Sequence, residues 1–330
     1  MSKVLLPVEN KKKYGYKDNS GQVIIDSQFD YAEEFVHGKA IIAVGDKYGF
    51  INENGNIVIE PIYDDVYNFS EGLAVVELNG KKGFIDETGK IAIEEKYDEV
   101  NSFCEGMAAV QVGYKWGYIN KNGETVVQPQ FLDAEDFSEG IALVQLGGKL
   151  GYINKQGQFI IEPKFSYAGS FNEGIAVVAE NKRYGFINSS GDFIIREKYS
   201  YAGDFNEGLA LVEIRGKYGY INKQDELVIE PAYDWVDSFY NGYAAVSKNE
   251  KYGFIDKTGK EIVPVKYDNV DSISEGLISV EVDGKWGYLN NNLEFVIKPK
   301  FDDAHEFING VAEAELHDKT VYINTKGEII

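Results

Sequence analysis

The amino-acid sequence predicts an all-β repeat protein, on three observations. A glycine recurs at every 34th residue from Gly15 to Gly287, and Val321 stands at the tenth position. The segments around these positions are short, rich in aromatic and β-branched residues, and bounded by turn residues, as is typical of strands. The chain contains 35 glycines, 23 tyrosines and 19 phenylalanines, which suits strands joined by tight turns. Because no insertion interrupts the period, we expect about ten units, each packed on the next.

Each repeat is expected to form a three-stranded antiparallel meander. Its first strand is a small apolar segment such as 73–78, and a tight turn, here Asn79–Gly80, joins it to the strand that carries the repeat glycine. A loop of the type seen at 52–55 then leads to a third strand, which contains Val126 and Val127 in one repeat. In that loop an Asn or Asp side chain can accept a bond from the backbone two residues on, and a glycine supplies the positive φ.

The linker between one repeat and the next is harder to assign. Tyr97, Val100 and Phe103 follow an i, i+3, i+6 spacing, which fits a helical turn better than a strand. A short irregular fourth strand is the alternative. Prolines precede five of these linkers and are expected to end the preceding strand, because proline has no N–H for the ladder. They are Pro61, Pro129, Pro163, Pro231 and Pro299.

We expect one repeat array over residues 1–330. An open, curved or superhelical stack of β-meanders is favoured, because neither end carries a spare linker or strand that would complete a blade. A closed propeller-like ring is the alternative, since the strand and turn rhythm loosely matches that of propeller blades. The expected units are about 1–34, 35–68, 69–102, 103–136, 137–170, 171–204, 205–238, 239–272, 273–306 and 307–330.

Composition and charge exclude several classes of function. The 54 acidic residues outnumber the 33 basic ones, giving a formal net charge of -21. Such a surface is repelled by nucleic acid and by anionic membranes. No apolar run reaches the roughly 18–20 residues that a membrane span needs. The first residues show no signal peptide, so we expect a cytoplasmic protein, or a secreted one if a leader was trimmed.

The repeat motif resembles a known family. KWGYIN at 115–120, KWGYLN at 285–290 and the repeated FSEG followed by a small apolar strand are similar to the bacterial WG-repeat family, also called KWG repeats. The resemblance covers nearly the whole chain in ten in-phase units. It implies an all-β repeat protein of a mostly bacterial family, usually without an assigned activity, for which interaction or scaffolding is the customary role.

The sequence gives no sign of a catalytic or metal site, and no cofactor is expected. His37, His305 and His317 occupy different repeat positions, and no pattern of a base with an orienting group accompanies them. Cys104 stands where other repeats have serine, which favours a structural role over a nucleophile. Acidic pairs such as Asp64–Asp65 make calcium conceivable, but no calcium-binding loop motif is present.

The repeated FSEG motif predicts a turn. Its glycine, Gly140 for example, is expected to have positive φ. Its glutamate is expected to make a contact within its own unit, with the lysine that stands two residues before the repeat glycine, as in Glu139 with Lys149.

The position just before the repeat glycine is the candidate binding slot. It varies enough between repeats to be a partly exposed face, on which aromatic rings anchor a protein partner or stack on sugars. Rings that cap neighbouring repeats are the structural alternative. The candidate residues are Trp116, Trp286, Tyr48, Tyr184, Tyr218, Tyr252 and, in a linker, Trp235.

We therefore expect a non-enzymatic binding or scaffold module that presents a long repeat surface to a protein partner. Variable turns such as 146–148, 180–181 and 248–250 are expected along one edge of the array, where repeat proteins display recognition residues. The acidic charge favours basic partner surfaces. Carbohydrate or cell-envelope binding through the aromatic slot is the alternative, and the sequence leaves the oligomeric state open.

Overall fold

The computed structural model describes residues 4–330, and every element in it is a β-strand. The strands form ten antiparallel sheets, which take consecutive strands in chain order. Eight sheets have four strands, from β4–β7 to β32–β35, and the sheets β1–β3 and β36–β38 have three. Residues 4–330 contain no helix that is long and apolar enough to cross a membrane. The predicted all-β class and tandem-repeat organisation are confirmed.

The chain divides into two compact units. The first is Leu5–Phe171 with the turn Ser189–Gly191, and the second is Asn172–Asn188 with Asp192–Ile330. The strands up to the end of the first unit are β1 (Leu5–Asn10), β2 (Lys13–Asp18), β3 (Val23–Phe29), β4 (Tyr31–Ala32), β5 (Lys39–Val44), β6 (Lys47–Asn52), β7 (Ile57–Tyr63), β8 (Asp65–Val66), β9 (Leu73–Leu78), β10 (Lys81–Asp86), β11 (Ile91–Tyr97), β12 (Glu99–Val100), β13 (Met107–Val112), β14 (Lys115–Asn120), β15 (Thr125–Phe131), β16 (Asp133–Ser138), β17 (Ile141–Leu146), β18 (Lys149–Asn154), β19 (Phe159–Phe165) and β20 (Tyr167–Ala168).

The second unit continues the same pattern. Its strands are β21 (Ile175–Ala179), β22 (Tyr184–Asn188), β23 (Phe193–Tyr199), β24 (Tyr201–Asn206), β25 (Leu209–Ile214), β26 (Lys217–Asn222), β27 (Leu227–Tyr233), β28 (Trp235–Val236), β29 (Tyr243–Lys248), β30 (Lys251–Asp256), β31 (Glu261–Tyr267), β32 (Asn269–Ser274), β33 (Leu277–Val282), β34 (Lys285–Asn290), β35 (Phe295–Phe301), β36 (Asp303–Ile308), β37 (Val311–Glu315) and β38 (Thr320–Asn324).

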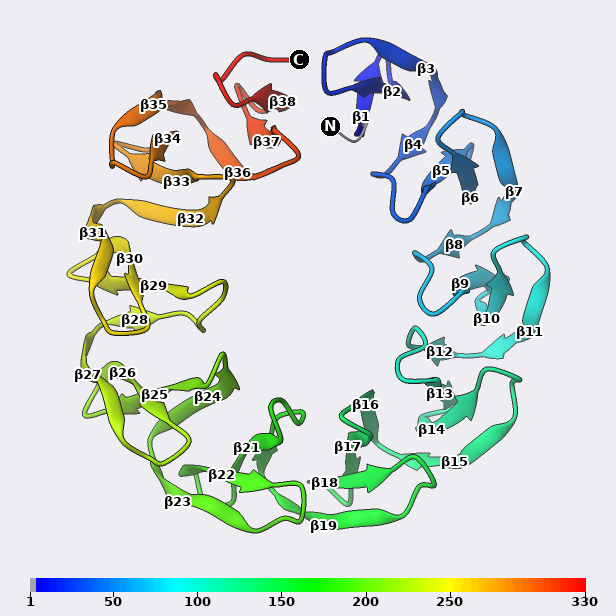
Figure 1. The fold of residues 1–330 in the computed structure, drawn as a ribbon. Coiled ribbons are helices and arrows are strands. Elements are labelled where there is room, and N and C mark those ends of the chain that lie inside the picture. Colours follow the sequence, from blue (N-terminus) through cyan, green and yellow to red (C-terminus); the bar gives the residue numbers. More distant parts are fainter. Residues whose placement is uncertain (1–3) are drawn as a thin grey trace. The chain divides into compact units, whose positions relative to one another are not determined.

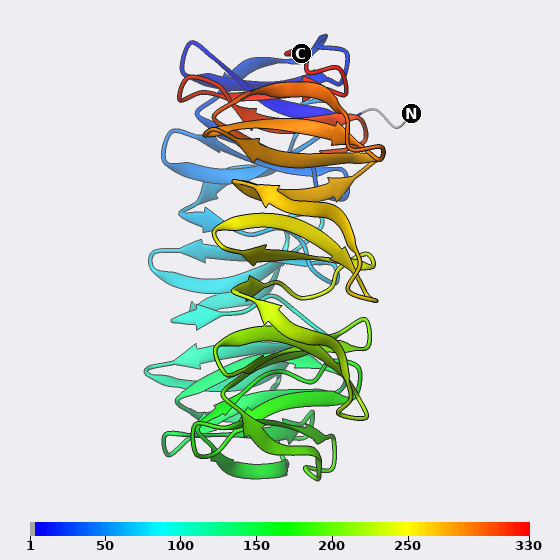
Figure 2. The same ribbon diagram turned by 90° about the vertical axis from the view of Figure 1, so that its left-hand side faces the viewer.

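Within each unit the sheets follow one another along an arc, and the first strand of each four-stranded sheet lies on its concave side (Figure 1). Figure 2 shows the sheets of the second unit nearly edge-on, with their turns at two opposite edges. Blades follow one another in this way in a propeller. The arrangement inside each unit therefore fits the propeller-like alternative better than a superhelical stack of meanders.

The linker forms a fourth strand, which is the alternative that the sequence left open, and not the favoured helical turn. Eight of the ten sheets therefore have four strands where three were predicted. In one sheet this strand is β16, which pairs with β17. Their register shifts between Ala134 and Phe137. A bulge of this kind lets two residues three positions apart face the same side of a strand. Ala134 and Phe137 take the positions of Val100 and Phe103, whose spacing looked helical; in that linker the strand is only Glu99–Val100, and Phe103 follows it.

The prolines do not end the strands that contain them, which corrects a second expectation. Pro61 lies inside β7, and the strand continues to Tyr63. β7 is the outermost strand of its sheet, where one side of the backbone needs no ladder partner. Proline is tolerated there because its missing N–H is not required.

The repeat glycine is required by a close approach of two backbones. A Cβ on Gly117 would lie 2.3 Å from the carbonyl oxygen of Val127, on the neighbouring strand β15. The register of β14 and β15 shifts at this point, between Trp116 and Tyr118. Val321 escapes the constraint because it lies in β38, an edge strand of its sheet.

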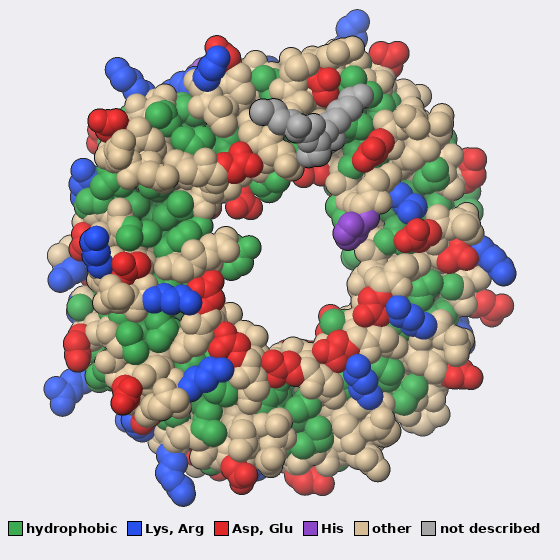
Figure 3. Space-filling view, in the orientation of Figure 1, with side chains coloured by type: hydrophobic (Ala, Val, Ile, Leu, Met, Phe, Trp, Pro, Cys, Tyr) green, Lys and Arg blue, Asp and Glu red, His purple; other side chains and the backbone are tan. Residues whose placement is uncertain are grey.

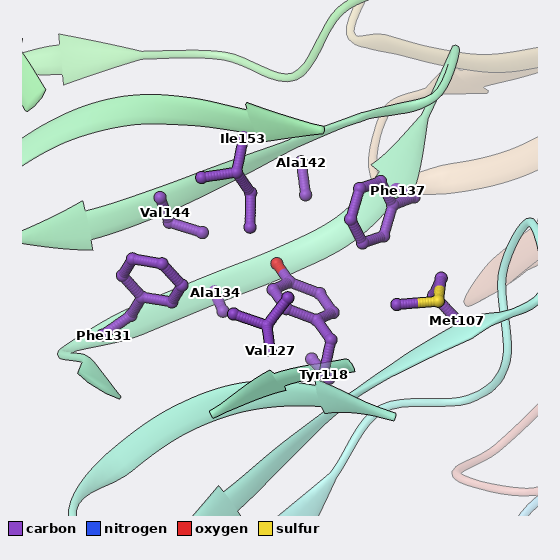
Figure 4. Packing of buried hydrophobic residues seen from close by; sticks show 10 residues of the cluster. Met107, Tyr118, Val127, Phe131, Ala134, Phe137, Ala142, Val144 and Ile153 are labelled. Carbon is purple, nitrogen blue, oxygen red and sulfur yellow. The ribbon is translucent and has the colours of Figure 1, made fainter. Parts of the chain in front are cut away.

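The cores lie between successive sheets and repeat the same aromatic contact. Figure 4 shows one of them, where Tyr118 from β14 faces Phe137 from the next sheet. The ring centroids are 4.9 Å apart, and the Tyr118 hydroxyl donates a 2.6 Å hydrogen bond to the backbone oxygen of Glu135. Burial of this hydroxyl is the main cause that raises the pKa of Tyr118 well above its ordinary value. Tyr16, Tyr152, Tyr220 and Tyr288 make the same bond to the sheet that follows, and in other repeats a phenylalanine at this position makes the ring contact alone.

Two glycine substitutions should separate backbone strain from steric conflict. Gly140 has φ +78° with open space around its missing Cβ, as the FSEG motif predicts. Gly140→Ala is expected to lower the free energy of unfolding by about 1 kcal/mol, through strain alone. Gly117→Ala is expected to cost on the order of 3 kcal/mol or more, because the new methyl group meets backbone atoms. Urea unfolding measures both, and equal midpoints for the two variants would contradict this account.

Candidate binding surface

The strands of each four-stranded sheet are joined by different turns at their two ends, and we call these two ends of the sheet edge A and edge B. Edge A is the edge that carries the tight turn between the second and third strands, such as Arg215–Gly216, and the linker residue before the next sheet, such as Ser200. Edge B carries the Glu–Gly turn, such as Glu207–Gly208, and the loop before the last strand, such as 223–226. The variable turns singled out in the sequence belong to edge A. Recognition residues are therefore expected there.

On edge A an aspartate ties neighbouring sheets together. The Asp98 carboxylate accepts a 2.5 Å bond from Lys81 Nζ and a 2.6 Å bond from the backbone N–H of Gly113, in the tight turn of the next sheet. The lysine and then the N–H lower the pKa of Asp98. We call this arrangement the Asp clamp. Six joints have it, through the pairs Lys13–Asp30, Lys47–Asp64, Lys81–Asp98, Lys217–Asp234, Lys251–Asp268 and Lys285–Asp302.

On edge B the FSEG glutamate makes a different contact from the one predicted. Glu105 accepts a 2.9 Å bond from the Gly140 N–H of the next sheet and lies 3.1 Å from Lys155 Nζ. Lys155 belongs to the loop before a last strand, not to the position two residues before the repeat glycine. The equivalent pairs are Glu71–Lys121, Glu173–Lys223 and Glu207–Lys257. Figure 3 shows such basic and acidic side chains side by side on the viewed face of each unit.

Cys104 occupies the position of a structural serine. Its Sγ donates to the Phe137 oxygen at 3.2 Å, as Ser70 Oγ donates to the Phe103 oxygen at 2.7 Å. Burial, followed by nearby carboxylates, raises the pKa of the Cys104 thiol. Over residues 4–330, no group of three or more His, Cys, Asp or Glu side chains could hold a metal ion.

The aromatic slot lies on edge A and is part of a longer row. A second aromatic position, 17 residues after the slot, places Tyr201 between Tyr184 and Tyr218. The ring centroids are 5.4 Å apart for Tyr184–Tyr201 and 6.3 Å for Tyr201–Tyr218. Farther along, Trp235 and Tyr252 are 6.0 Å apart. The rings are tilted or edge-on to one another, so each supports its neighbour and still presents part of its surface.

The sequence missed half of this row. It singled out Trp235 but not Tyr201 or Tyr31, which take the same position in other linkers. Tyr31 packs against Tyr48 with centroids 5.9 Å apart. A search for a 17-residue spacing, half the repeat, would have found the row.

The two tryptophans of the slot have different surroundings. Trp286 is only 8% exposed and packs in a core cluster with Tyr288 and Ile297, so its ring offers little surface to a ligand. Trp116 is half-buried and lines a pocket of about 570 Å³. Asn101 and Asp136 line the same pocket and are joined by a 2.9 Å hydrogen bond.

Comparison with known proteins identifies the repeat. The family model described as the WG containing repeat matches nine tandem segments: 14–48, 48–81, 83–116, 116–149, 151–184, 184–218, 218–252, 252–286 and 286–319. The chain is similar to a solved structure described as the crystal structure of the eukaryotic initiation factor, with 12% identity and a TM-score of 0.57, over 89% of this chain and 95% of that one. It is also similar to Hsv2p of Kluyveromyces lactis, with 8% identity and a TM-score of 0.37, over 66% and 88%. The first likeness concerns the fold alone. No curated protein matches the chain.

The Asp clamp should make stability depend on acid pH. The folded-state pKa of Asp98 lies below the ordinary value of 3.8, so its ion pair contributes stability above about pH 4 and loses it as the pH falls through the folded-state pKa. Asp98→Asn is expected to lower the urea midpoint at pH 7, with the difference from the unsubstituted protein shrinking toward pH 2. Asp46→Asn is the control, because Asp46 is an exposed turn residue with no ion pair in residues 4–330. A difference that stays constant from pH 7 to pH 2 would contradict the clamp.

Proposed function

The chain belongs to the family of WG containing repeats, and from that premise we propose that it is a non-enzymatic binding module whose second unit holds a protein partner on edge A. One observation carries the proposal. Five aromatic side chains follow one another at 17-residue intervals along this edge: Tyr184, Tyr201, Tyr218, Trp235 and Tyr252.

The row has the properties of a protein-binding surface. Tyr201 is 40% exposed and Trp235 is 44% exposed, so both offer apolar area and a polar tip. Tyr and Trp side chains of this kind are enriched among the anchor residues of protein interfaces. Because each ring packs on a neighbour from another strand, little rotamer freedom is left to lose on binding.

The turns beside the row supply the variation that specificity needs. Tight turns at the same edge carry Arg215–Gly216, Asn249–Glu250 and Asp283–Gly284 at equivalent positions. They differ in charge and size while the strands beneath them repeat. A fixed aromatic base with variable polar borders is the anatomy of many interfaces.

Binding of a carbohydrate is the second candidate, at a different place. Trp116 lines the 570 Å³ pocket of the first unit with Asn101, Asp133 and Asp136. An aromatic face beside amide and carboxylate groups suits the two sides of a sugar ring, one apolar and one hydroxylated.

The protein-partner proposal is tested by capture followed by purified binding. Affinity capture from the native host's extract identifies a partner, and calorimetry with the purified partner then compares variants. Trp235→Ala and Tyr201→Ala are each expected to weaken binding about tenfold or more, as anchor truncations do. Tyr240→Ala is the matched control, because Tyr240 is 71% exposed in the same unit but lies at edge B. Equal losses for all three variants, or a capture without a partner, would refute the proposal.

The carbohydrate candidate is tested by a broad glycan screen. A bound glycan should be lost on Trp116→Ala and kept on Trp235→Ala, since these tryptophans lie in different units and only Trp116 lines the pocket. A screen without any bound glycan would refute this candidate.

A further inference from the structure

One joint on edge A of the second unit lacks the carboxylate of the Asp clamp. Ser200 stands at the position that Asp98 and Asp234 occupy in other joints. Its hydroxyl donates to the backbone oxygen of Glu213 at 3.2 Å and reaches no lysine or arginine among the described residues. The clamp's two donors therefore remain at this joint without the acceptor that joins them elsewhere.

Both donors are present. Arg183 takes the place of the clamp lysine, and its hydrogen bond, 3.3 Å to the backbone oxygen of Lys198, uses one of five guanidinium N–H groups. The backbone N–H of Arg215 is equivalent to that of Gly113, which donates to Asp98 at 2.6 Å. Within residues 4–330 the Arg215 N–H has no acceptor. These donors are left to bond water, so a ligand that offers them a better acceptor gains binding free energy.

A pocket lies at the joint where the aspartate is missing. It measures about 370 Å³ and extends from edge A, where Arg183, Ser200, Glu213 and Arg215 line it, along the sheet to the pair Lys198–Asp225, whose aspartate lies in the loop before the last strand. Lys198 forms an ion pair with Asp225, which replaces the glycine found at this loop position in most repeats. The pocket is thus lined by two arginines and by one carboxylate, Glu213, that has no ion pair among residues 4–330, so it keeps a net positive charge.

Arginine occurs in this chain only near the pocket. The chain has only three arginines, Arg183, Arg196 and Arg215, and all of them lie within 33 residues of a sequence whose net charge is -21. Every other clamp position before a repeat glycine has lysine. Arginine binds a carboxylate through two parallel N–H bonds, whereas lysine acts as a point charge.

We infer that this pocket binds a carboxylate of the protein partner, in the place that an aspartate of the chain itself takes at six other joints. The inference deepens the proposed function and rests on it for the source of the carboxylate, either an acidic side chain or a C-terminus. The pocket adjoins the aromatic row, since Glu213, which lines it, pairs across the sheet with both Tyr201 and Tyr218. Glu213 favours a singly charged carboxylate over a doubly charged phosphate, because it repels the second charge.

The test reads the pocket without the partner. The Arg215 amide signal is followed by NMR during titration with three probes at constant ionic strength: acetyl-Gly-Glu-Gly-amide, acetyl-Gly-Gly-Gly with a free C-terminus, and inorganic phosphate. At least one peptide should shift the signal saturably, and the tighter peptide assigns the source of the carboxylate. Phosphate should bind more weakly than that peptide.

Two variants test the pocket, one by supplying a carboxylate from the chain itself and one by removing a positive charge. Ser200→Asp supplies the missing carboxylate from within, so peptide binding should weaken at least tenfold while the thermal midpoint rises. Arg183→Gln removes the charge and should weaken binding by a similar factor, whatever Ser200→Asp does to folding. Leu132→Asp is the matched control, because Leu132 takes the same position beside Lys115 and Gly147 in the first unit. It should leave binding at Arg215 unchanged.

Three results would overturn the inference: no saturable shift of the Arg215 amide with either peptide, phosphate binding tighter than both, or Ser200→Asp binding as the unsubstituted protein does. Failure of the proposed function looks different. If the peptides saturate the pocket but Trp235→Ala and Tyr201→Ala leave partner affinity unchanged, the pocket stands and the aromatic row is not the docking surface.

Discussion

The architecture depends on one close approach between two backbones, at the repeat glycine. At 2.3 Å from the carbonyl oxygen of Val127, a Cβ on Gly117 has no room, so the third strand of each four-stranded sheet can lie against the last strand, where the register shifts, only if this residue is glycine. The shift in register sets which side chains of the last strand face the next sheet. Aromatic contacts such as Tyr118–Phe137 then hold successive sheets at a constant spacing, which is why the period tolerates no insertion.

Departures from the repeat come in matched sets. Ile273 replaces the linker phenylalanine, and Tyr243 from a neighbouring strand fills the place, with its ring 5.6 Å from Phe254. Leu293 replaces a loop glycine and packs in the same cluster as Val263, which is smaller than the isoleucine of most repeats. Against this habit of compensation, the Ser200 joint stands apart. Its lysine is replaced by Arg183 while its aspartate is replaced by Ser200, so the side-chain donor is kept and the acceptor is lost.

The sequence predicted what is local and periodic. The repeat glycine, the tight turns and the positive φ of Gly140 follow from backbone geometry within a few residues. What it missed depends on pairing across sheets. The linker strand was hidden because its three-residue spacing of apolar side chains also fits a helical turn, and the lysine that bonds Glu105 lies 50 residues away in the loop of another sheet. The aromatic row was half-visible, because its spacing is half the repeat and its members belong to two different strands.

The electrostatics of edge A explain how an acidic chain can take an acidic group. The net charge of -21 attracts basic surfaces over the distance of about 10 Å that salt leaves unscreened. The pocket binds its carboxylate only at contact distance. In the clamps each aspartate is paired with a lysine, so the clamps add no net negative charge to this edge. A partner with a broadly basic surface and one carboxylate at its centre would be attracted by the net charge and would also fit the pocket. Long-range attraction would bring it to the chain, and the fit of a single carboxylate between Arg183 and the Arg215 N–H would fix its register on the aromatic row.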